Sequence, residues 1–153
     1  MTPPDPLIVL VAVDGSPASL AAVQHLVGLA ARGLPLQPVL VNVQPPPTLY
    51  EVVLAHDRER LDAIRAGAGA DLLAPALALV RAAGLEPQHD VIGGEPANAI
   101  VDFAETVGAE LLLIGARGEG GSTHALGGTA VAVLEQSNVP VTVVRSPDPD
   151  AEP

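Results

Sequence analysis

Leu7-Ile-Val-Leu-Val-Ala-Val13 is an unbroken apolar run, and Asp14-Gly15-Ser16-Pro17 follows it directly. An apolar run of this length without alternation is typical of a strand buried on both faces of a parallel sheet. Ser16 is a natural helix N-cap, and Pro17 is a natural first helical residue. Apolar residues then recur at helical spacing up to residue 31, before Gly33. The stretch therefore predicts a buried strand followed at once by a helix over 17–31.

The same alternation of strand and helix continues along the chain. Four more strands are expected at 39–43, 86–92, 110–114 and 140–144, with helices over 51–83, over 96–107 and up to about Ser137. Gly67, Gly69 and Pro75 predict a break or kink near 66–75 in the second helix. Strict alternation predicts an α/β fold with one open, parallel, five-stranded sheet and helices on both faces. We expect a single domain over 1–145 and a flexible acidic tail over 146–153.

The composition excludes several kinds of chemistry. The 153 residues include 18 acidic and seven basic residues, all seven of them arginine, and the formal net charge is −11. The absence of lysine excludes a Walker-type phosphate loop and Schiff-base catalysis. The absence of cysteine excludes thiolate catalysis and Cys-based metal sites. So acidic a chain argues against nucleic-acid binding. With no membrane span or signal peptide evident, we expect a cytoplasmic protein.

Ligands of open α/β sheets bind beyond the carboxyl ends of the strands, where the strand order reverses. Three loops at such positions have a distinctive composition, namely 14–16, 93–96 and 115–129. The last holds six glycines within residues 115–128 and then Thr129. Glycine lets the backbone approach a ligand closely, and backbone N–H groups at a helix start bind phosphate. A phosphate-binding loop and a glycine loop without a ligand are the two interpretations of this segment.

The charged residues of these loops also allow two interpretations each. Asp14 could form an Asx-turn that caps the next helix, or it could accept hydrogen bonds from ligand hydroxyls or hold a metal ion. Both roles are compatible. Arg117 could neutralise a phosphate or lie in solvent. No spacing of serine, histidine and aspartate supports a catalytic triad, so we expect ligand binding rather than turnover.

Three motifs in register resemble the universal stress protein family over about residues 7–145. These are the strand that ends in Asp14-Gly15-Ser16, the pattern Gly115-x2-Gly118-x9-Gly128-Thr129, and the last strand, 139–145. The resemblance implies a sheet ordered 3-2-1-4-5, with the Asp14 and Gly115 loops facing one crevice. It also implies the branch of the family that binds ATP or a related adenine nucleotide, with Mg²⁺ or Mn²⁺ at the phosphates.

The resemblance assigns roles by position. Asp14 would lie by the ribose or the metal ion, Val13 and Val41 would line the adenine pocket, and the phosphates would lie in the cradle of the glycine loop. The residues implied as nucleotide-binding are Val13, Asp14, Val41, Ile114, Gly115, Arg117, Gly118, Gly128, Thr129 and Ala130. The last strand, Val141 to Val144, would form a homodimer.

The sequence departs from the family pattern at Asn42, where many members have histidine, and at Glu119. Because Glu119 makes the loop less cationic, AMP or ADP remains open beside ATP. Three functions therefore stand as hypotheses: an adenine-nucleotide-binding stress-response protein, a ligand-independent dimeric interaction module, and a slow ATP hydrolase.

Overall fold

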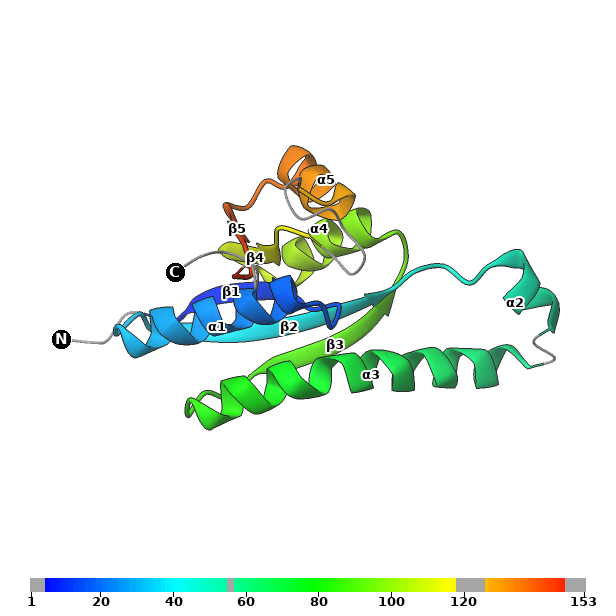
Figure 1. Ribbon diagram of the computed structural model, residues 1–153, viewed down its shortest axis with the longest axis horizontal. Coiled ribbons are helices and arrows are strands. Elements are labelled where there is room, and N and C mark those ends of the chain that lie inside the picture. Colours follow the sequence, from blue (N-terminus) through cyan, green and yellow to red (C-terminus); the bar gives the residue numbers. More distant parts are fainter. Residues whose placement is uncertain (1–4, 55–56, 118–125, 148–153) are drawn as a thin grey trace.

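The chain folds into one parallel sheet of five strands, as the alternation of elements predicts, in the order β3-β2-β1-β4-β5 that the resemblance implies. The computed structural model describes residues 5–54, 57–117 and 126–147. Figure 1 shows the helices on both faces of the sheet. In chain order, the elements are β1 (Leu7–Ala12), α1 (Pro17–Ala31), β2 (Leu36–Gln44), α2 (Leu49–Leu54), α3 (Arg58–Ala82), β3 (Gln88–Gly93), α4 (Pro96–Val107), β4 (Leu111–Gly115), α5 (Gly128–Gln136) and β5 (Val141–Val144).

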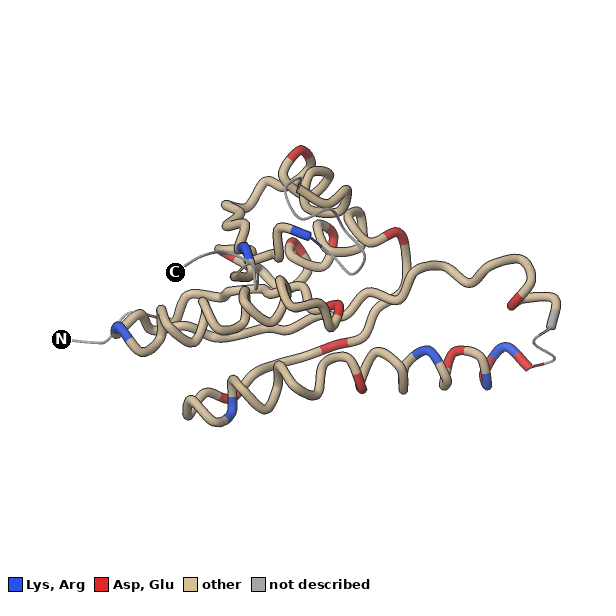
Figure 2. The backbone as a smooth tube through the Cα atoms, in the orientation of Figure 1, with Lys and Arg blue, Asp and Glu red and all other residues tan. Residues whose placement is uncertain are grey.

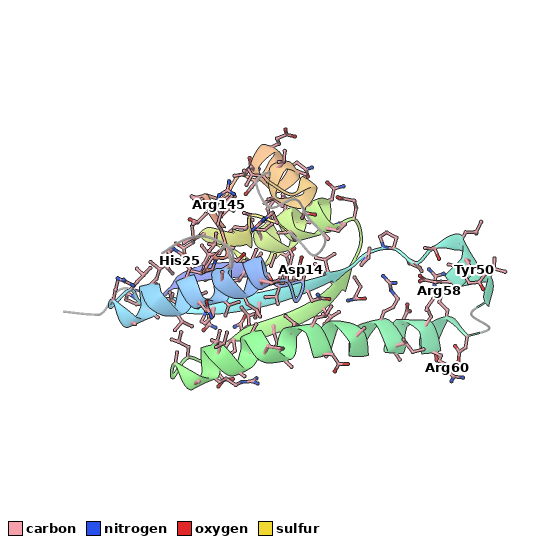
Figure 3. The ribbon with its side chains drawn as sticks, viewed as in Figure 1. Asp14, His25, Tyr50, Arg58, Arg60 and Arg145 are labelled. Atoms are coloured by element: carbon pink, nitrogen blue, oxygen red, sulfur yellow. The ribbon has the colours of Figure 1, made fainter. Side chains whose placement is uncertain are left out.

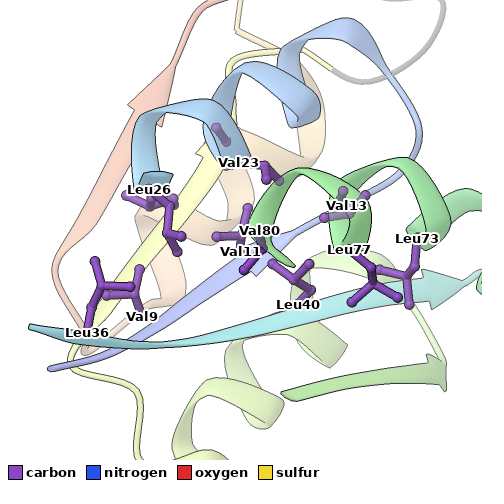
Figure 4. Packing of buried hydrophobic residues seen from close by; sticks show 13 residues of the cluster. Val9, Val11, Val13, Val23, Leu26, Leu36, Leu40, Leu73, Leu77 and Val80 are labelled. Carbon is purple, nitrogen blue, oxygen red and sulfur yellow. The ribbon is translucent and has the colours of Figure 1, made fainter. Parts of the chain in front are cut away.

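Two apolar clusters lie on opposite faces of the sheet. On one face, α1 and α3 pack against β1 through Val9, Val11 and Val13, all at most 1% exposed (Figure 4). On the other face, α4 and α5 pack against Leu10 and residues of β2 and β4. Consecutive side chains of a strand point to opposite faces, so a continuously apolar β1 supplies both clusters. This explains why the first strand needs no polar residue.

The strand order places β1 at the centre, paired with both β2 and β4. The chain runs from β1 to β2 to β3 in one direction, and β4 and β5 then add on the other side of β1. The carboxyl ends of β1 and β4 therefore lie side by side at the point where the order reverses. Ligands of this fold class bind at that point.

Of the break or kink predicted near 66–75, the break is wrong, because α3 runs without interruption from Arg58 to Ala82. Pro75 lies inside the helix and removes one backbone hydrogen bond. Burial of Leu73, Ala76, Leu77 and Val80 against the sheet offsets that loss. The break lies earlier, between α2 and the Asp57 side chain that caps α3.

Gly69 has a packing role in α3. A Cβ at this position would lie 2.4 Å from Val91 Cγ1 and 2.8 Å from Asn42 Oδ1. The glycine therefore lets α3 approach β2 and β3 closely. By length and composition, α3 could also cross a membrane, with a mean hydropathy of 1.5 and 22% burial in its apolar window. Its core residues, however, pack on the sheet.

Two strands differ slightly from their predicted bounds. β2 begins at Leu36 rather than at residue 39, because Leu36, Gln37 and Pro38 already pair with Leu7, Ile8 and Val9 of β1. β3 spans Gln88–Gly93, two residues later at its start than predicted. Neither difference moves the carboxyl ends of the strands that face the predicted site.

Candidate functional site

A pocket of about 140 Å³ lies at the carboxyl ends of β1, β2 and β4. Its wall is completed by the first turns of α1, α4 and α5. A cavity of about 150 Å³ is large enough for one benzene ring, so this pocket suits a single flat ring with the remainder of a ligand outside it. Its lining residues are Ala12, Val13, Asp14, Ser16, Ser19, Val41, Val43, Pro96, Ile100, Ile114, Gly115, Arg117, Thr129 and Ala130.

Asp14 forms the predicted Asx-turn at the end of β1. Its Oδ1 accepts a 2.8 Å hydrogen bond from the Ser16 N–H, and the Ser16 Oγ in turn accepts one from the Ser19 N–H at 3.2 Å. Gly15 has φ +84, a conformation that side chains rarely adopt, and this turns the chain from β1 into α1. The turn presents an exposed carboxylate at the pocket (Figure 3). Capping and ligand contact are therefore compatible at this residue.

Asn42 holds the end of β1 in place from β2. Its side chain is 2% exposed and donates a 2.8 Å hydrogen bond to the Val13 carbonyl oxygen. The Val13 N–H donates to the Val41 carbonyl at 2.8 Å. Gln44 then donates to Asn42 Oδ1 at 2.8 Å, so both ends of the Asn42 amide have partners. Both backbone polar groups of Val13, the N–H and the carbonyl, are thus held by β2 directly before Asp14.

Gly115 is needed where β4 passes under α1. A Cβ there would lie 2.8 Å from the Ala18 carbonyl carbon and from the Ser19 backbone nitrogen. Real Cβ atoms do not come so close to backbone atoms. The close contact brings the end of β4 and the first turn of α1 against each other, which forms one wall of the pocket.

The first turn of α5 lacks a side-chain cap. Gly127 is its N-cap, and among the described residues no side chain caps the first N–H groups. In contrast, Ser16, Asp57 and Glu95 cap α1, α3 and α4 through side-chain oxygens. The Gly127 N–H donates to the Ala116 carbonyl at 2.7 Å, which brings the two ends of the glycine loop together. Backbone donors at a helix start carry partial positive charge and attract anions.

The pocket brings together eight of the ten residues that the sequence analysis singled out. These are Val13, Asp14, Val41, Ile114, Gly115, Arg117, Thr129 and Ala130. Gly128 adjoins them, and a Cβ added to it would meet no atom of the described residues within 4 Å. Gly118 lies outside the described residues.

Six lining residues were not expected at the pocket: Ala12, Ser16, Ser19, Val43, Pro96 and Ile100. The signal for Pro96 and Ile100 was present, because Pro96 ends the distinctive loop 93–96 after β3 and Ile100 follows one helical turn later. Their place at the pocket depends on how α4 crosses the sheet, which composition does not reveal. Ser19 lies one helical turn after the N-cap Ser16. The sequence analysis gave this turn only a capping role and did not consider Ser19 as a pocket residue.

Within the part of the chain that the structure describes, no group of three histidine, aspartate or glutamate residues could hold a metal ion. Among the described residues, Asp14 is the one carboxylate that lines the pocket. Mg²⁺ commonly binds through one or two carboxylates together with phosphates of a ligand. A single carboxylate does not make a metal site by itself. It does fit a metal ion that is also held by the phosphates of a bound ligand.

Several solved structures share the fold over nearly the whole chain. The hypothetical protein MJ0577 matches with a TM-score of 0.79 and 21% identity, covering 93% of this chain and 97% of that one. A universal stress protein in complex with cAMP gives 0.66 at 24% identity, covering 94% and 100%. A universal stress protein family protein from Arabidopsis thaliana with AMP bound gives a TM-score of 0.71 at 17% identity, covering 96% of each chain. At these identities, the likeness shows a common fold.

Sequence comparison adds the family. Universal stress protein MJ0531 of Methanocaldococcus jannaschii is 26% identical over 140 residues, which cover 91% of this chain and 82% of the relative. Universal stress protein G of Shigella flexneri is 40% identical over a shorter segment of 52 residues, 34% of this chain and 37% of the relative. The model of the universal stress protein family matches residues 7–145. The chain therefore belongs to the universal stress protein family.

Proposed function

We propose that this protein binds an adenine nucleotide, ATP or AMP, in the pocket between β1 and β4 as part of a stress response. The observation that carries the proposal is the first turn of α5, which has a glycine N-cap without a side-chain oxygen and lies at the same pocket as the Asp14 carboxylate. One end of the pocket thus offers donors to an anion, and the other offers an acceptor to hydroxyl groups. The structures with cAMP and AMP have the same fold and support this assignment.

The phosphates would bind the backbone N–H groups of Thr129 and Ala130, the Thr129 hydroxyl and the glycine loop, including Gly118 and Gly128. Backbone donors suit this chain because it has no lysine to contact phosphate. Arg117 lines the same pocket and is half-buried.

The base would lie on the apolar wall, where Val13, Val41 and Ile114 are at most 5% exposed. Ile100 of α4 lines the same pocket and belongs to the same apolar cluster as Val41 and Ile114. A flat ring between such side chains would be removed from water, which favours binding. The ribose would then lie within reach of Asp14. The proposed ligand therefore matches the pocket in having an apolar end, a hydroxyl-bearing middle and an anionic end.

The proposed activity is binding and not turnover. Asp14 and Arg117 are the titratable residues among the described lining, and one Asp14 oxygen already accepts from Ser16. An enzyme that activates water needs a positioned general base near the phosphate. We expect any ATP hydrolysis to be slow.

Mg²⁺ or Mn²⁺ would accompany the phosphates, with Asp14 as a direct or water-mediated ligand. The chain has a net charge of −11, which opposes a triphosphate unless a cation offsets it. The proposal also includes a cytoplasmic homodimer that pairs through β5. This half-buried strand of valines and threonine is the last of the sheet, and an unpaired apolar edge favours pairing with another strand.

Calorimetric titration with ATP, ADP and AMP, each with and without Mg²⁺, tests the proposal. The matched variants are Gly128→Val and Gly67→Val. Both positions lie in helices with open space around the added Cβ, so both variants should fold. Gly128→Val should lose nucleotide binding, and Gly67→Val, at an exposed site of α3, should keep it.

The outcomes separate the three hypotheses. No heat with any adenine nucleotide would overturn the proposal and favour an interaction module. Equal affinity in the two glycine variants would move the site away from α5. Phosphate release above the level without protein, lost in Gly128→Val, would establish the slow hydrolase.

A further inference from the structure

The two edges of the sheet differ in the backbone groups that they present. β3 and β5 are the edge strands, so each has backbone N–H and C=O groups on its free side. Four of the six residues of β3 are exposed, and all four residues of β5 are half-buried. Unpaired edge groups can pair with a strand of another molecule, so the state of each edge decides how copies of this chain can associate through the sheet.

The register shows which backbone groups of β3 face outward. Gln44 of β2 is paired with Gly93, and its carbonyl oxygen accepts a 3.1 Å hydrogen bond from the N–H of Gly94. Gly94 therefore faces β2. Along a strand, the backbone groups of successive residues point alternately to one neighbouring strand and to the other side. The residues whose backbone groups face away from β2 are thus Pro87, His89, Val91 and Gly93.

Two of these four outward positions offer no donor to another strand. Pro87 has no backbone N–H. The N–H of Val91 donates a 2.9 Å hydrogen bond to Oδ1 of Asp90. Asp90 is the only acidic residue of β3, and Figure 2 shows acidic colouring on that strand. The N–H groups of His89 and Gly93 remain, about 13 Å apart along the strand. A strand laid along this edge would therefore meet no two successive donors.

The β5 edge keeps an N–H at each outward position. Leu112 and Ala116 donate to the carbonyl oxygens of Pro140 and Val144 at 2.9 and 2.7 Å, so Pro140 and Val144 face β4. By the same alternation, the outward residues are Val141, Val143 and Arg145. None of these three is a proline, and β5 contains no charged residue. The β5 edge thus offers the continuous row of donors that β3 lacks.

We propose that Asp90, together with Pro87, closes the β3 edge to strand pairing, so that copies of this chain join through β5 alone and the assembly ends at two subunits. The part concerning β5 rests on the homodimer proposed above, and the closure of β3 does not. Asp90 Oδ1 occupies the Val91 donor, and its negative charge repels the carbonyl oxygen that an incoming strand would place there.

The closed edge has a consequence for assembly. If β3 of one copy could pair with β5 of the next, the contact would join two different surfaces of the chain. A contact of this kind that does not close into a ring continues into a filament. Pairing of β5 with β5, in contrast, uses the same surface on both copies and stops at two.

Substitution of Asp90 tests the proposal by analytical ultracentrifugation over a range of protein concentrations. The wild-type mass should level off at two subunits. Asp90→Val frees the Val91 N–H and adds a residue that favours strands, so its mass should keep rising. Asp90→Asn keeps an acceptor oxygen, and Asp102→Val removes the same charge from an exposed position of α4, so both should level off like the wild type. Asp90→Ala, which frees the same N–H, repeats the test if circular dichroism shows that Asp90→Val does not fold.

Hydrogen exchange locates the new contact. In Asp90→Val, exchange of the amides in residues 88–93 should slow as concentration rises, whereas in the wild type it should not depend on concentration. The proposal is overturned if Asp90→Val and Asp90→Ala gain no mass over the wild type. Growth of the wild type beyond two subunits with slowed exchange over 88–93 would also overturn it. A monomeric wild type would contradict the β5 dimer, and the closure of β3 would then be supported by association of Asp90→Val above one subunit.

Discussion

The substitution Asn42→Asp tests how the end of β1 is held, because it replaces one N–H2 group by an oxygen and keeps the shape. The lost donor faces the Val13 carbonyl oxygen at 2.8 Å, and the side chain is 2% exposed. Losing the hydrogen bond costs about 1 kcal/mol, and leaving a buried carbonyl without a partner costs about 1–3 kcal/mol. We therefore expect a loss of about 3 kcal/mol in the free energy of unfolding when the new carboxylate is ionised.

The loss should depend on pH with a defined sign. Burial opposite a carbonyl oxygen raises the pKa of the introduced carboxyl above its value in the unfolded chain. The protonated acid can donate to Val13 again, so the variant is closest to wild type at low pH. Its deficit grows as pH rises through the folded-state pKa. Between about pH 5 and pH 7.5, we expect the deficit to grow by at least about 1 kcal/mol, since one pKa unit is worth about 1.4 kcal/mol.

Urea denaturation followed by circular dichroism at both pH values measures this deficit. Asn138→Asp is the matched control, because it adds the same charge at an exposed residue between α5 and β5. Its difference from wild type should be small and nearly independent of pH. Equal pH dependence in the two variants would refute the buried donor role of Asn42.

Further predictions follow from single contacts. Gly69→Ala should cost about 1–3 kcal/mol, because its Cβ would lie 2.4 Å from Val91 Cγ1, whereas Gly67→Ala should add up to about 1 kcal/mol of stability. Ser16→Ala should cost about 1 kcal/mol, because it removes the side-chain oxygen that caps α1. Urea titration measures all three, and equal stability of the two glycine variants would contradict the packing assigned to Gly69. Chelation of Mg²⁺ should weaken ATP binding in calorimetry at least about tenfold and AMP binding much less, because the triphosphate carries more charge. Equal affinities with and without metal would remove Asp14 from any metal role.

The fold could be predicted from the sequence because its strands are locally unambiguous. The run from Leu7 to Val13 is apolar on both faces, and this pattern is typical of a central parallel strand. The Asp14 to Pro17 turn and the glycine loop also marked the correct strand ends. Because these loops follow neighbouring strands, their meeting in one pocket follows from the topology alone.

The errors came from residues whose role depends on tertiary contacts. Gly69 and Pro75 are local helix breakers, yet close packing of α3 on the sheet keeps the helix continuous. Asn42 was noted only as a departure from the family, since its hydrogen bond to Val13 joins residues 29 positions apart. The separate helix α2 was merged with α3, because a short amphipathic signal cannot locate a turn without the packing that surrounds it.

Three close glycine contacts surround the end of β1: Gly15 against Leu72, Gly69 against Val91, and Gly115 against the first turn of α1. A scan of all substitutions, scored by ligand binding, would find these glycines among the most sensitive positions even though a Cβ at each meets protein atoms. A second measurement, of how much folded protein each variant yields, would separate these glycines from Asp14 and Thr129. The side chains of Asp14 and Thr129 lie exposed at the pocket, so their substitution should leave the amount of folded protein nearly unchanged. The glycines that shape the backbone are therefore different residues from those whose side chains line the pocket. Substitutions at the pocket could change the ligand without disturbing the close packing around the end of β1.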